Sequence, residues 1–274
     1  MSPFIIFTDL DGTLLDHDTY SFEAAREALE RVASAQVPLI ICSSKTRAEI
    51  ETWRRKLENI DPFISENGGG VFFPKTWKRL LSGQEVEKEG YLIVEFGKPY
   101  VDVLSRFKRL KDRFGETIKG FSEMSVNEIA RATGLANAEA ALAKQREYTE
   151  PFLFTGTEEE EKRLQENVAQ MKLNLTRGGR FFHLMGDNDK GKAVIRVVQF
   201  YKKKAPGVRS VGMGDSRNDL PLLQSVDIPI VVQKPGGGYD DALQSVQGVR
   251  RAAGVGPEGW NKAVVEILGR KLQP

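Results

Sequence analysis

Two aspartates are separated by a single residue near the amino terminus, in the stretch FTDLDGTLLD (residues 7–16). They follow FIIF (4–7), a short apolar run that is typical of a strand buried on both faces of a parallel sheet. An aspartate at such a strand end can attack a phosphoryl group and form an acyl phosphate, which divides a difficult displacement into two easier steps. In this hypothesis Asp9 is the nucleophile. Asp11, on the same face of the extended stretch, protonates the leaving oxygen and later activates water.

The reaction needs a divalent cation, because the attacking carboxylate and the phosphate are both anions. Mg²⁺ prefers octahedral oxygen ligands, usually one or two carboxylates together with phosphate and water. A second acidic stretch, GDSRND (214–219), supplies further oxygens of this kind. The candidate magnesium ligands are Asp9, Asp11, Asp215, Ser216, Asn218 and Asp219.

Charge on the transferred phosphoryl group also calls for hydrogen-bond donors and a cation. Ser43 in CSSKT (42–46) and Lys190 in DNDKGK (187–192) are the candidates. Asp219 can either hold Lys190 in place or contact the metal through water, and both roles stay open. Alone, an Asp-x-Asp pair is more often a solvated turn, and GDSRND is more often a turn and helix cap. The occurrence of all four stretches in order, beside expected strands and helix starts, favours the catalytic hypothesis.

The surrounding pattern predicts the elements that position these side chains. Strands and amphipathic helices alternate near both ends of the chain, up to a last expected helix over GWNKAVVEILGRKL (259–272), whereas the middle of the chain has an α+β pattern that begins with the strand YLIVEF (91–96). The predicted fold class is therefore α/β: a doubly wound, Rossmann-like parallel-sheet core formed by residues 1–89 and 187–274, with an inserted α+β domain at 90–186. In such a core, ligands bind at the carboxyl ends of the strands.

Composition narrows the choice of partners. Lys and Arg number 40 against 38 for Asp and Glu, a balance that favours neither nucleic acid nor a membrane as partner. Cys42 is the only cysteine, so no internal disulfide is possible, and its place in an apolar run predicts a packing role. The amino terminus does not have the pattern of a secretory signal, and the expected location is cytoplasmic. Composition does not indicate an oligomeric state.

The chemical motifs resemble those of the haloacid dehalogenase-type phosphatases. DLDGT matches the first motif of that family, Lys190 followed by Gly191 matches the third, and GDSRND matches the fourth. The second motif differs, since relatives with this insert commonly have Thr-Gly-Arg where this chain has Ser43, Ser44 and Lys45. Ser43 keeps the hydroxyl, and the part played by Lys45 stays open. The resemblance implies the fold, the aspartyl-phosphate reaction and the Mg²⁺ requirement described above.

The insert resembles the α/β (type IIB) cap of that family, because it lies between the second and third motifs. Within the family the chain is similar to the mannosyl-3-phosphoglycerate phosphatases, in the stretches ICSSKT, SENGGG, ATGL, AKQREYTEP and GGRFFHLMGDNDKG. This resemblance implies that the substrate is a small phosphorylated sugar or glycerate. It implies that the products are mannosylglycerate and phosphate. The substrate-binding residues that it implies are Ser44, Glu66, Asn67, Gly68, Arg146, Arg180 and His183.

Several of these residues have plain structural alternatives. Arg146 can pair with Glu150 at helical spacing. His183 can be a satisfied core histidine, Arg180 can lie in an ordinary hairpin, and SENGGG (65–70) can form an ordinary turn.

Three other functions compete with this one. The same core can act on another ester, such as glucosyl-3-phosphoglycerate, sucrose phosphate or a hexose phosphate, or it can return the phosphoryl group to a sugar as a phosphomutase. A non-catalytic binding protein is disfavoured because Asp9, Asp11 and Asp215 are all present. In each enzymatic case the cap is expected to close over the core and exclude water.

Overall fold

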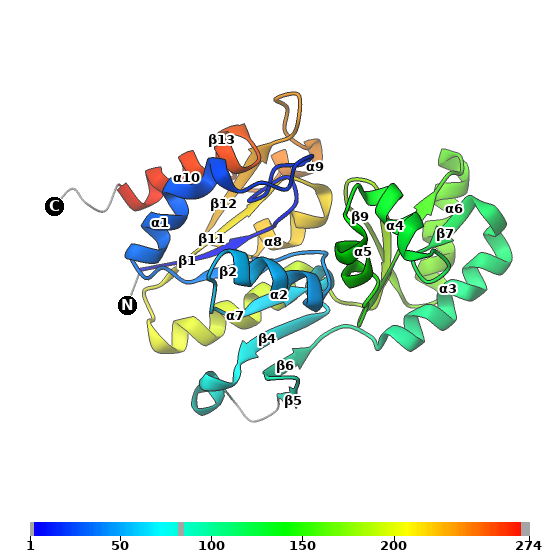
Figure 1. The fold of residues 1–274 in the computed structure, drawn as a ribbon, viewed down its shortest axis with the longest axis horizontal. Coiled ribbons are helices and arrows are strands. Elements are labelled where there is room, and N and C mark those ends of the chain that lie inside the picture. Colours follow the sequence, from blue (N-terminus) through cyan, green and yellow to red (C-terminus); the bar gives the residue numbers. More distant parts are fainter. Residues whose placement is uncertain (1–2, 82–84, 270–274) are drawn as a thin grey trace.

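Two sheets organise the chain, and Figure 1 shows them side by side, with the larger on the left. The computed structural model describes residues 3–81 and 85–269. The larger sheet has nine strands in the order β13-β12-β11-β1-β2-β3-β4-β6-β5, and the smaller has four in the order β7-β8-β10-β9. The larger sheet contains the first and the last strand of the described chain, so the smaller sheet is an insertion.

Six strands of the larger sheet are parallel, which confirms the predicted parallel-sheet core. They are β1 (Phe4–Thr8), β2 (Leu39–Cys42), β3 (Phe63–Ser65), β11 (Arg209–Gly214), β12 (Ile228–Gln233) and β13 (Arg250–Val255). Successive side chains of β1 point to opposite faces, so Ile6 packs in one hydrophobic cluster and Ile5 with Phe7 in the other. This double burial explains the continuous apolar run FIIF.

Helices cover both faces of this sheet (Figure 1). One face carries α1 (Arg26–Ser34), α2 (Arg47–Lys56) and α10 (Pro257–Gly269); the other carries α7 (Lys190–Lys204), α8 (Leu220–Gln224) and α9 (Asp241–Gln244). Short 3₁₀ turns lie at η1 (Glu23–Ala25), η2 (Glu66–Gly68), η3 (Lys75–Leu80), η4 (Gly115–Thr117) and η5 (Arg217–Asp219).

Cys42 is buried in β2, where it packs with the core. The expected final helix ends at Gly269, and the last residues predicted for it lie outside the described part of the chain.

The strand at 91–96 was predicted to open the insert, and that assignment is wrong. β6 (Tyr91–Glu95) pairs antiparallel with β4 (Gly70–Pro74) and with β5 (Val86–Lys88), which extends the larger sheet. Leu92 and Ile93 of β6 are buried in the two clusters of that sheet, one on each face. We therefore propose that the insert begins after β6 rather than at residue 90.

The smaller sheet is antiparallel and carries helices on both sides. Its strands are β7 (Ile118–Gly120), β8 (Thr149–Phe154), β9 (Asn174–Arg177) and β10 (Phe182–Met185). The long helices α3 (Tyr100–Phe114) and α6 (Glu158–Gln170) pack on one face, as their apolar spacing predicts. Two short helices, α4 (Val126–Thr133) and α5 (Asn137–Ala143), pack in a separate cluster, and α5 contacts α2 of the core. We refer to this inserted unit as the cap.

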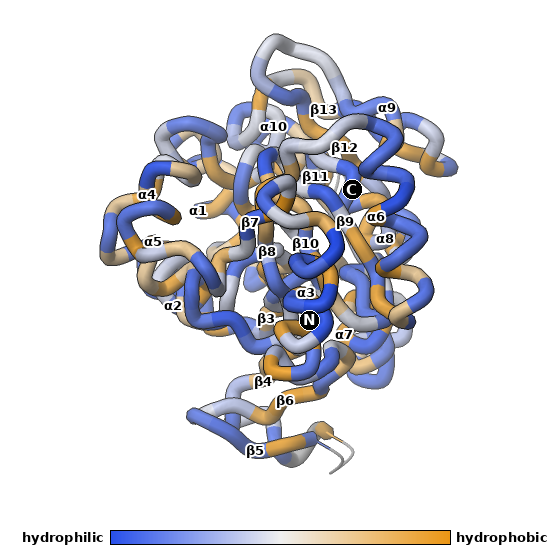
Figure 2. The backbone as a smooth tube through the Cα atoms, turned by 90° about the vertical axis from the view of Figure 1, so that its right-hand side faces the viewer, coloured by the Kyte–Doolittle hydropathy of each residue, from blue (hydrophilic) through white to orange (hydrophobic). Residues whose placement is uncertain are grey.

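Hydrophobic and hydrophilic residues alternate along the helices in Figure 2, as expected for helices that each cover one face of a sheet. Among residues 3–81 and 85–269, no helix has both the length and the apolar character that a membrane span requires.

Candidate active site

Three buried carboxylates and one lysine meet at the carboxyl end of the parallel sheet. Asp9 follows β1, Asp215 follows β11 and Asp219 lies in η5; ligand atoms of the three lie within 4.8 Å of one another. Lys190, the first residue of α7, places Nζ 2.7 Å from Asp9 Oδ1 and 2.6 Å from Asp219 Oδ1. The amide of Asp9 donates to the carbonyl of Met213, which fixes the end of β1 against β11. Strand ends far apart in the sequence thus converge, as the topology predicts.

Asp219 is held on both carboxylate oxygens by protein donors. Oδ1 accepts from Lys190, and Oδ2 accepts from the backbone N–H groups of Asp215 and Ser216 at 3.1 Å each. The contact with Lys190 is one of the two roles that the sequence left open for Asp219.

Asp215 is braced from two sides. The hydroxyl of Thr13 donates to its Oδ1 at 3.2 Å, and that of Ser216 donates to Oδ2 at 2.8 Å. Gly12 has φ +74°, a conformation that favours glycine, and a Cβ there would lie 2.9 Å from Asp215 Oδ2, so the carboxylate would have to shift. Ser216 thus contacts the predicted metal site through Asp215. Asn218 donates from Nδ2 to Asn67 Oδ1 at 3.2 Å.

The electrostatics of this cluster suit a bound cation. Burial raises the pKa of Asp9 well above its usual value, although Lys190 acts in the opposite direction. Burial, together with the neighbouring Asp219, raises the pKa of Asp215 to about 7. Burial alone would lower the pKa of Lys190, but Asp219 and Asp9 outweigh it and keep the lysine charged. The cluster thus holds three carboxylates and one ammonium, which contacts two of them, and the oxygen-rich donor set fits a metal ion that prefers oxygen.

The second motif lies beside this cluster, at the end of β2 and the start of α2. Ser43 is buried, and its hydroxyl accepts from the N–H of Lys45 at 3.3 Å. The carbonyl of Ser44 accepts from Arg146 of the cap at 3.0 Å. Lys45, whose part the sequence left open, places Nζ 3.0 Å from Asp11 Oδ2.

A cleft separates core and cap above the carboxylates. From the core, its walls include Asp9, Asp11, Ser44, Lys45, Ser216 and Asn218; from the cap, they include Arg146, Arg180 and His183. The structure thus brings together at one cleft most of the residues that the sequence singled out. His17, Tyr20 and Thr133 also line it, and sequence reasoning missed all three because no motif or spacing marks them.

The three cap residues differ in their surroundings. Arg180 is exposed in the turn between β9 and β10 and donates to the carbonyl of Thr133 at 3.0 Å. His183 is buried in β10, where burial lowers its pKa to about 3, and its Nδ1 has no partner among the described residues. A neutral imidazole with an unpaired nitrogen at a cleft is suited to a hydrogen bond with a neutral ligand group.

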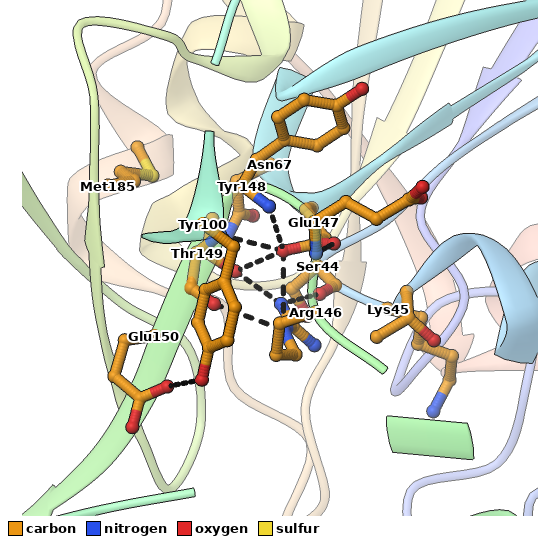
Figure 3. Close-up of polar contacts among 12 residues, drawn as sticks. Ser44, Lys45, Asn67, Tyr100, Arg146, Glu147, Tyr148, Thr149, Glu150 and Met185 are labelled. Atoms are coloured by element: carbon orange, nitrogen blue, oxygen red, sulfur yellow. Dashed lines mark hydrogen bonds and ion pairs between the residues drawn. The ribbon is translucent and has the colours of Figure 1, made fainter. Parts of the chain in front are cut away.

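Arg146 does not pair with Glu150, so the helical-spacing alternative is wrong. Arg146 precedes β8 and is buried against Thr149, Ser44 and Glu66. Glu150 lies within β8, where its carboxylate accepts from Tyr100 instead (Figure 3). The hydroxyl of Ser122 also donates to it, at 2.6 Å.

Glu66 does not face the cleft, contrary to the expectation that it binds substrate. Its side chain is fully buried and accepts from the backbone N–H groups of Glu147, Tyr148 and Thr149 at 2.7, 3.1 and 2.8 Å. The hydroxyl of Thr149 and the guanidinium of Arg146 complete its partners; Figure 3 shows these residues gathered around one carboxylate. Glu66 therefore fastens a cap segment to the core.

Asn67 and Gly68 also lie outside the cleft wall in the described chain. Asn67 has φ 54° and its carbonyl accepts from Asn188 at 3.3 Å. Gly68 has φ +86°, and a Cβ there would lie 2.1 Å from the carbonyl oxygen of Asp189. The glycine permits close packing against the start of α7, where Lys190 begins the helix, rather than an approach to substrate.

The fastening by Glu66 predicts a large loss of stability when it is removed. Replacement by alanine is expected to lower the free energy of unfolding by about 3–5 kcal/mol, because Arg146 is then buried without its counter-charge. The amides of Tyr148 and Thr149 should also exchange hydrogen faster. Denaturant unfolding and hydrogen exchange measure the two effects. The control is Glu116→Ala, since Glu116 is an almost fully exposed cap carboxylate whose loss should change stability by at most about 0.5 kcal/mol. Equal unfolding midpoints for the two variants would contradict the assignment.

Comparison with known proteins gives consistent results in sequence and fold. The chain is 44% identical over 266 residues to a glucosyl-3-phosphoglycerate/mannosyl-3-phosphoglycerate phosphatase from Methanococcoides burtonii, with 97% of each chain covered. It is 41% identical over 266 residues to a protein of the same name from Persephonella marina, covering 96% of this chain and 97% of the relative. It is 34% identical over 229 residues to a mannosyl-3-phosphoglycerate phosphatase from Pyrococcus horikoshii, covering 83% and 90%.

Solved structures with low sequence identity share the fold. A haloacid dehalogenase subclass IIB sugar phosphatase superposes with a TM-score of 0.66 at 17% identity, covering 97% of this chain and 99% of that chain. The sucrose-phosphatase of Synechocystis gives 0.63 at 13% identity, covering 98% and 99%. The family model described as haloacid dehalogenase-like hydrolase matches residues 6–235, which include the whole cap and all four motifs. The chain therefore belongs to the haloacid dehalogenase-like hydrolases.

Proposed function

We propose that the protein is a Mg²⁺-dependent phosphomonoesterase that hydrolyses mannosyl-3-phosphoglycerate and glucosyl-3-phosphoglycerate. The observation that carries the chemistry is the buried contact of Lys190 with Asp9 and Asp219, beside Asp215 and below a cleft lined by Asp11. The relatives named above, which match nearly the whole chain, support the choice of substrate.

The reaction proceeds in two steps that these residues can perform. An oxygen of Asp9 bonds to phosphorus while the bond from phosphorus to the 3-oxygen of the glycerate breaks, and Asp11 gives that oxygen its proton. The neutral alcohol leaves, and Asp9 holds an acyl phosphate. Water then attacks phosphorus, Asp11 takes a proton from it, and the bond to Asp9 breaks. Phosphate is released, and both side chains return to their starting states.

Other side chains prepare Asp9 and the phosphoryl group for this reaction. Lys190 is held by Asp219, so its ammonium stays beside the nucleophile and near the charge of the phosphate. Ser43 accepts from the N–H of Lys45, which leaves its own proton to donate to a phosphate oxygen.

Mg²⁺ would be held by the carboxylates of Asp9 and Asp215, with Asp11, Ser216, Asn218 and Asp219 around them. When bound, it neutralises charge between the carboxylate and the phosphate. The raised pKa values of Asp9 and Asp215 support this assignment, because a cation relieves the cost of burying both charges.

The cap supplies contacts for the rest of the substrate. Arg180 at the cleft can pair with the glycerate carboxylate, and His183 can hydrogen-bond a sugar hydroxyl. Arg146 contributes indirectly, because its guanidinium fixes the carbonyl of Ser44 in the cleft wall.

Phosphate release from a panel of esters tests the proposal. With Mg²⁺, kcat/KM for the two glycosyl-3-phosphoglycerates is expected to exceed that for sucrose phosphate and hexose phosphates by at least about 10-fold, since the competitors lack the carboxylate. Chelator should abolish release. Preference for sucrose phosphate or a hexose phosphate would overturn the substrate and retain the reaction. Isomerised sugar phosphate without free phosphate would indicate a mutase, and tight binding without turnover of any ester would indicate a binding protein.

A further inference from the structure

Lys45 is a buried cation that the reaction described above does not use. Its side chain is 6% exposed, and Nζ lies 3.0 Å from Asp11 Oδ2 and 3.6 Å from Glu49 Oε1. The ring of Tyr20 covers the ammonium, with its centroid 5.2 Å from Nζ. All four residues line the cleft. A buried ammonium with two carboxylates and an aromatic face around it has a well-defined position.

The elements around Lys45 hold it still. It lies just before α2, and its backbone N–H donates to the hydroxyl of Ser43. Glu49 is fixed by the capping box of α2, where the N–H of Thr46 donates to Glu49 Oε2 at 2.9 Å. The other oxygen of Glu49 is thus turned toward Lys45. Lys45 therefore has two carboxylate partners. Glu49 is held in place by the capping box, and Asp11 is the candidate general acid.

The two oxygens of Asp11 differ in a way that bears on its role. Oδ2 is taken by Lys45, whereas Oδ1 is buried and has no hydrogen-bond partner among the described residues. A carboxyl group that must give a proton to a leaving oxygen and take one from water needs one oxygen fixed and one available.

We propose that Lys45 is the positioning residue for Asp11: it fixes Oδ2, so that Oδ1 is oriented for proton transfer. The inference rests on the proposed function, since it assigns a part in the same reaction. It gives the lysine of the second motif a task distinct from that of Lys190, because Lys190 contacts Asp9 and Asp219 instead.

Two other roles for Lys45 make different predictions. If Lys45 bound the substrate phosphate directly, its loss would affect all phosphate esters alike. If it only stabilised the fold, its loss would lower the melting temperature without separating one ester from another. A positioning role affects only esters whose leaving group needs a proton.

The test compares an alkyl ester, glycerol 2-phosphate, with an aryl ester, 4-nitrophenyl phosphate, in the presence of Mg²⁺. The measured quantity is kcat/KM, which reports the steps up to departure of the alcohol. For Lys45→Met, kcat/KM on the alkyl ester is expected to fall by about 10²–10³-fold, the usual contribution of a general acid. On the aryl ester the fall should be below about 10-fold, since nitrophenolate leaves without a proton.

A double-mutant cycle separates action through Asp11 from independent action. In an Asp11→Asn background, Lys45→Met should change kcat/KM on the alkyl ester by less than about 3-fold, because the group that it positions is already gone. Lys45→Arg, which keeps the charge, should recover much of the lost rate.

Each remaining outcome has a definite meaning. Equal losses on the two esters, or additive losses in the cycle, would overturn the inference and leave the proposed function standing. Inactivity of the wild-type protein on both esters and on the glycosyl-3-phosphoglycerates would overturn the proposed function and this inference with it. If Lys45→Met does not fold, Glu49→Gln is used instead, because it removes the charge that holds Lys45 from the other side. Its kcat/KM on the alkyl ester should fall by less than that of Lys45→Met, with no fall on the aryl ester. Equal falls on the two esters for Glu49→Gln would also overturn the inference.

Discussion

Replacement of Asp9 by asparagine is expected to lower kcat by about 10⁴-fold or more, the size of effect seen when a nucleophile is removed. The amide that replaces the carboxylate cannot form an acyl phosphate. The fold should persist, because asparagine has the same shape and still offers an oxygen to Lys190. Steady-state phosphate release measures the loss, and thermal unfolding checks the fold.

Asp187→Asn is the matched control for this variant. Asp187 lies in the stretch before α7, is largely exposed and pairs with Lys192, so its replacement removes one negative charge outside the cleft. Its kcat should stay within about 2-fold of wild type, as surface changes have small effects. A folded Asp9→Asn variant that releases phosphate at the wild-type rate would show that Asp9 is not the nucleophile.

Replacement of Lys190 by methionine is expected to affect stability and activity together. Asp9 and Asp219 would be left buried without their cation, which costs about 3–5 kcal/mol of unfolding free energy. The loss of unfolding free energy should be smaller at pH 5 than at pH 8. Because burial already raises the pKa of Asp9, this carboxyl takes up a proton in the folded state as the pH falls, and the uncompensated charge disappears. Denaturant unfolding at the two pH values measures this.

Activity of the same variant should fall by about 10³-fold, because a preorganised cation at the developing charge is lost. Lys192→Met is the control, since Lys192 lies one place beyond Gly191 in the same helix, is 42% exposed and pairs with an exposed carboxylate. If the two lysine variants unfolded at the same denaturant concentration at both pH values, Lys190 would not be the counter-ion of the cluster.

The carboxylate cluster was predictable because its geometry follows from topology. Asp9 and Asp215 each follow a β-rich apolar run, and parallel strands in one sheet end at one edge, so their positions in the sequence imply their meeting in space. Lys190 was found for a related reason. The stretch that contains Lys190 begins α7. Asp189 caps this helix by accepting from the N–H of Lys192, and this start of the helix places Lys190 at the edge of the sheet.

The attachment of cap to core was not predictable from periodicity or motif. Glu66 and Asn67 have positive φ values, 47° and 54°. The side-chain type alone does not predict this conformation. The partner of Glu66 is a run of backbone N–H groups, which carries no signature in the sequence. Strand β6 was misplaced for a similar reason: its apolar pattern suits a strand in either sheet, and only its pairing with β4 decides.

The carboxylate of Glu66 has a consequence for how the cap of this protein can be moved to another core. An enzyme engineer who transplanted residues 97–186 into another core, guided by the two sheets, would leave Glu66 behind and bury Arg146 without its counter-charge. The transplanted cap would then be unstable, even if its own sheet folded. The unit that can be moved between cores is therefore the cap together with the SENGGG turn, two pieces of sequence that must be inherited or recombined as a pair.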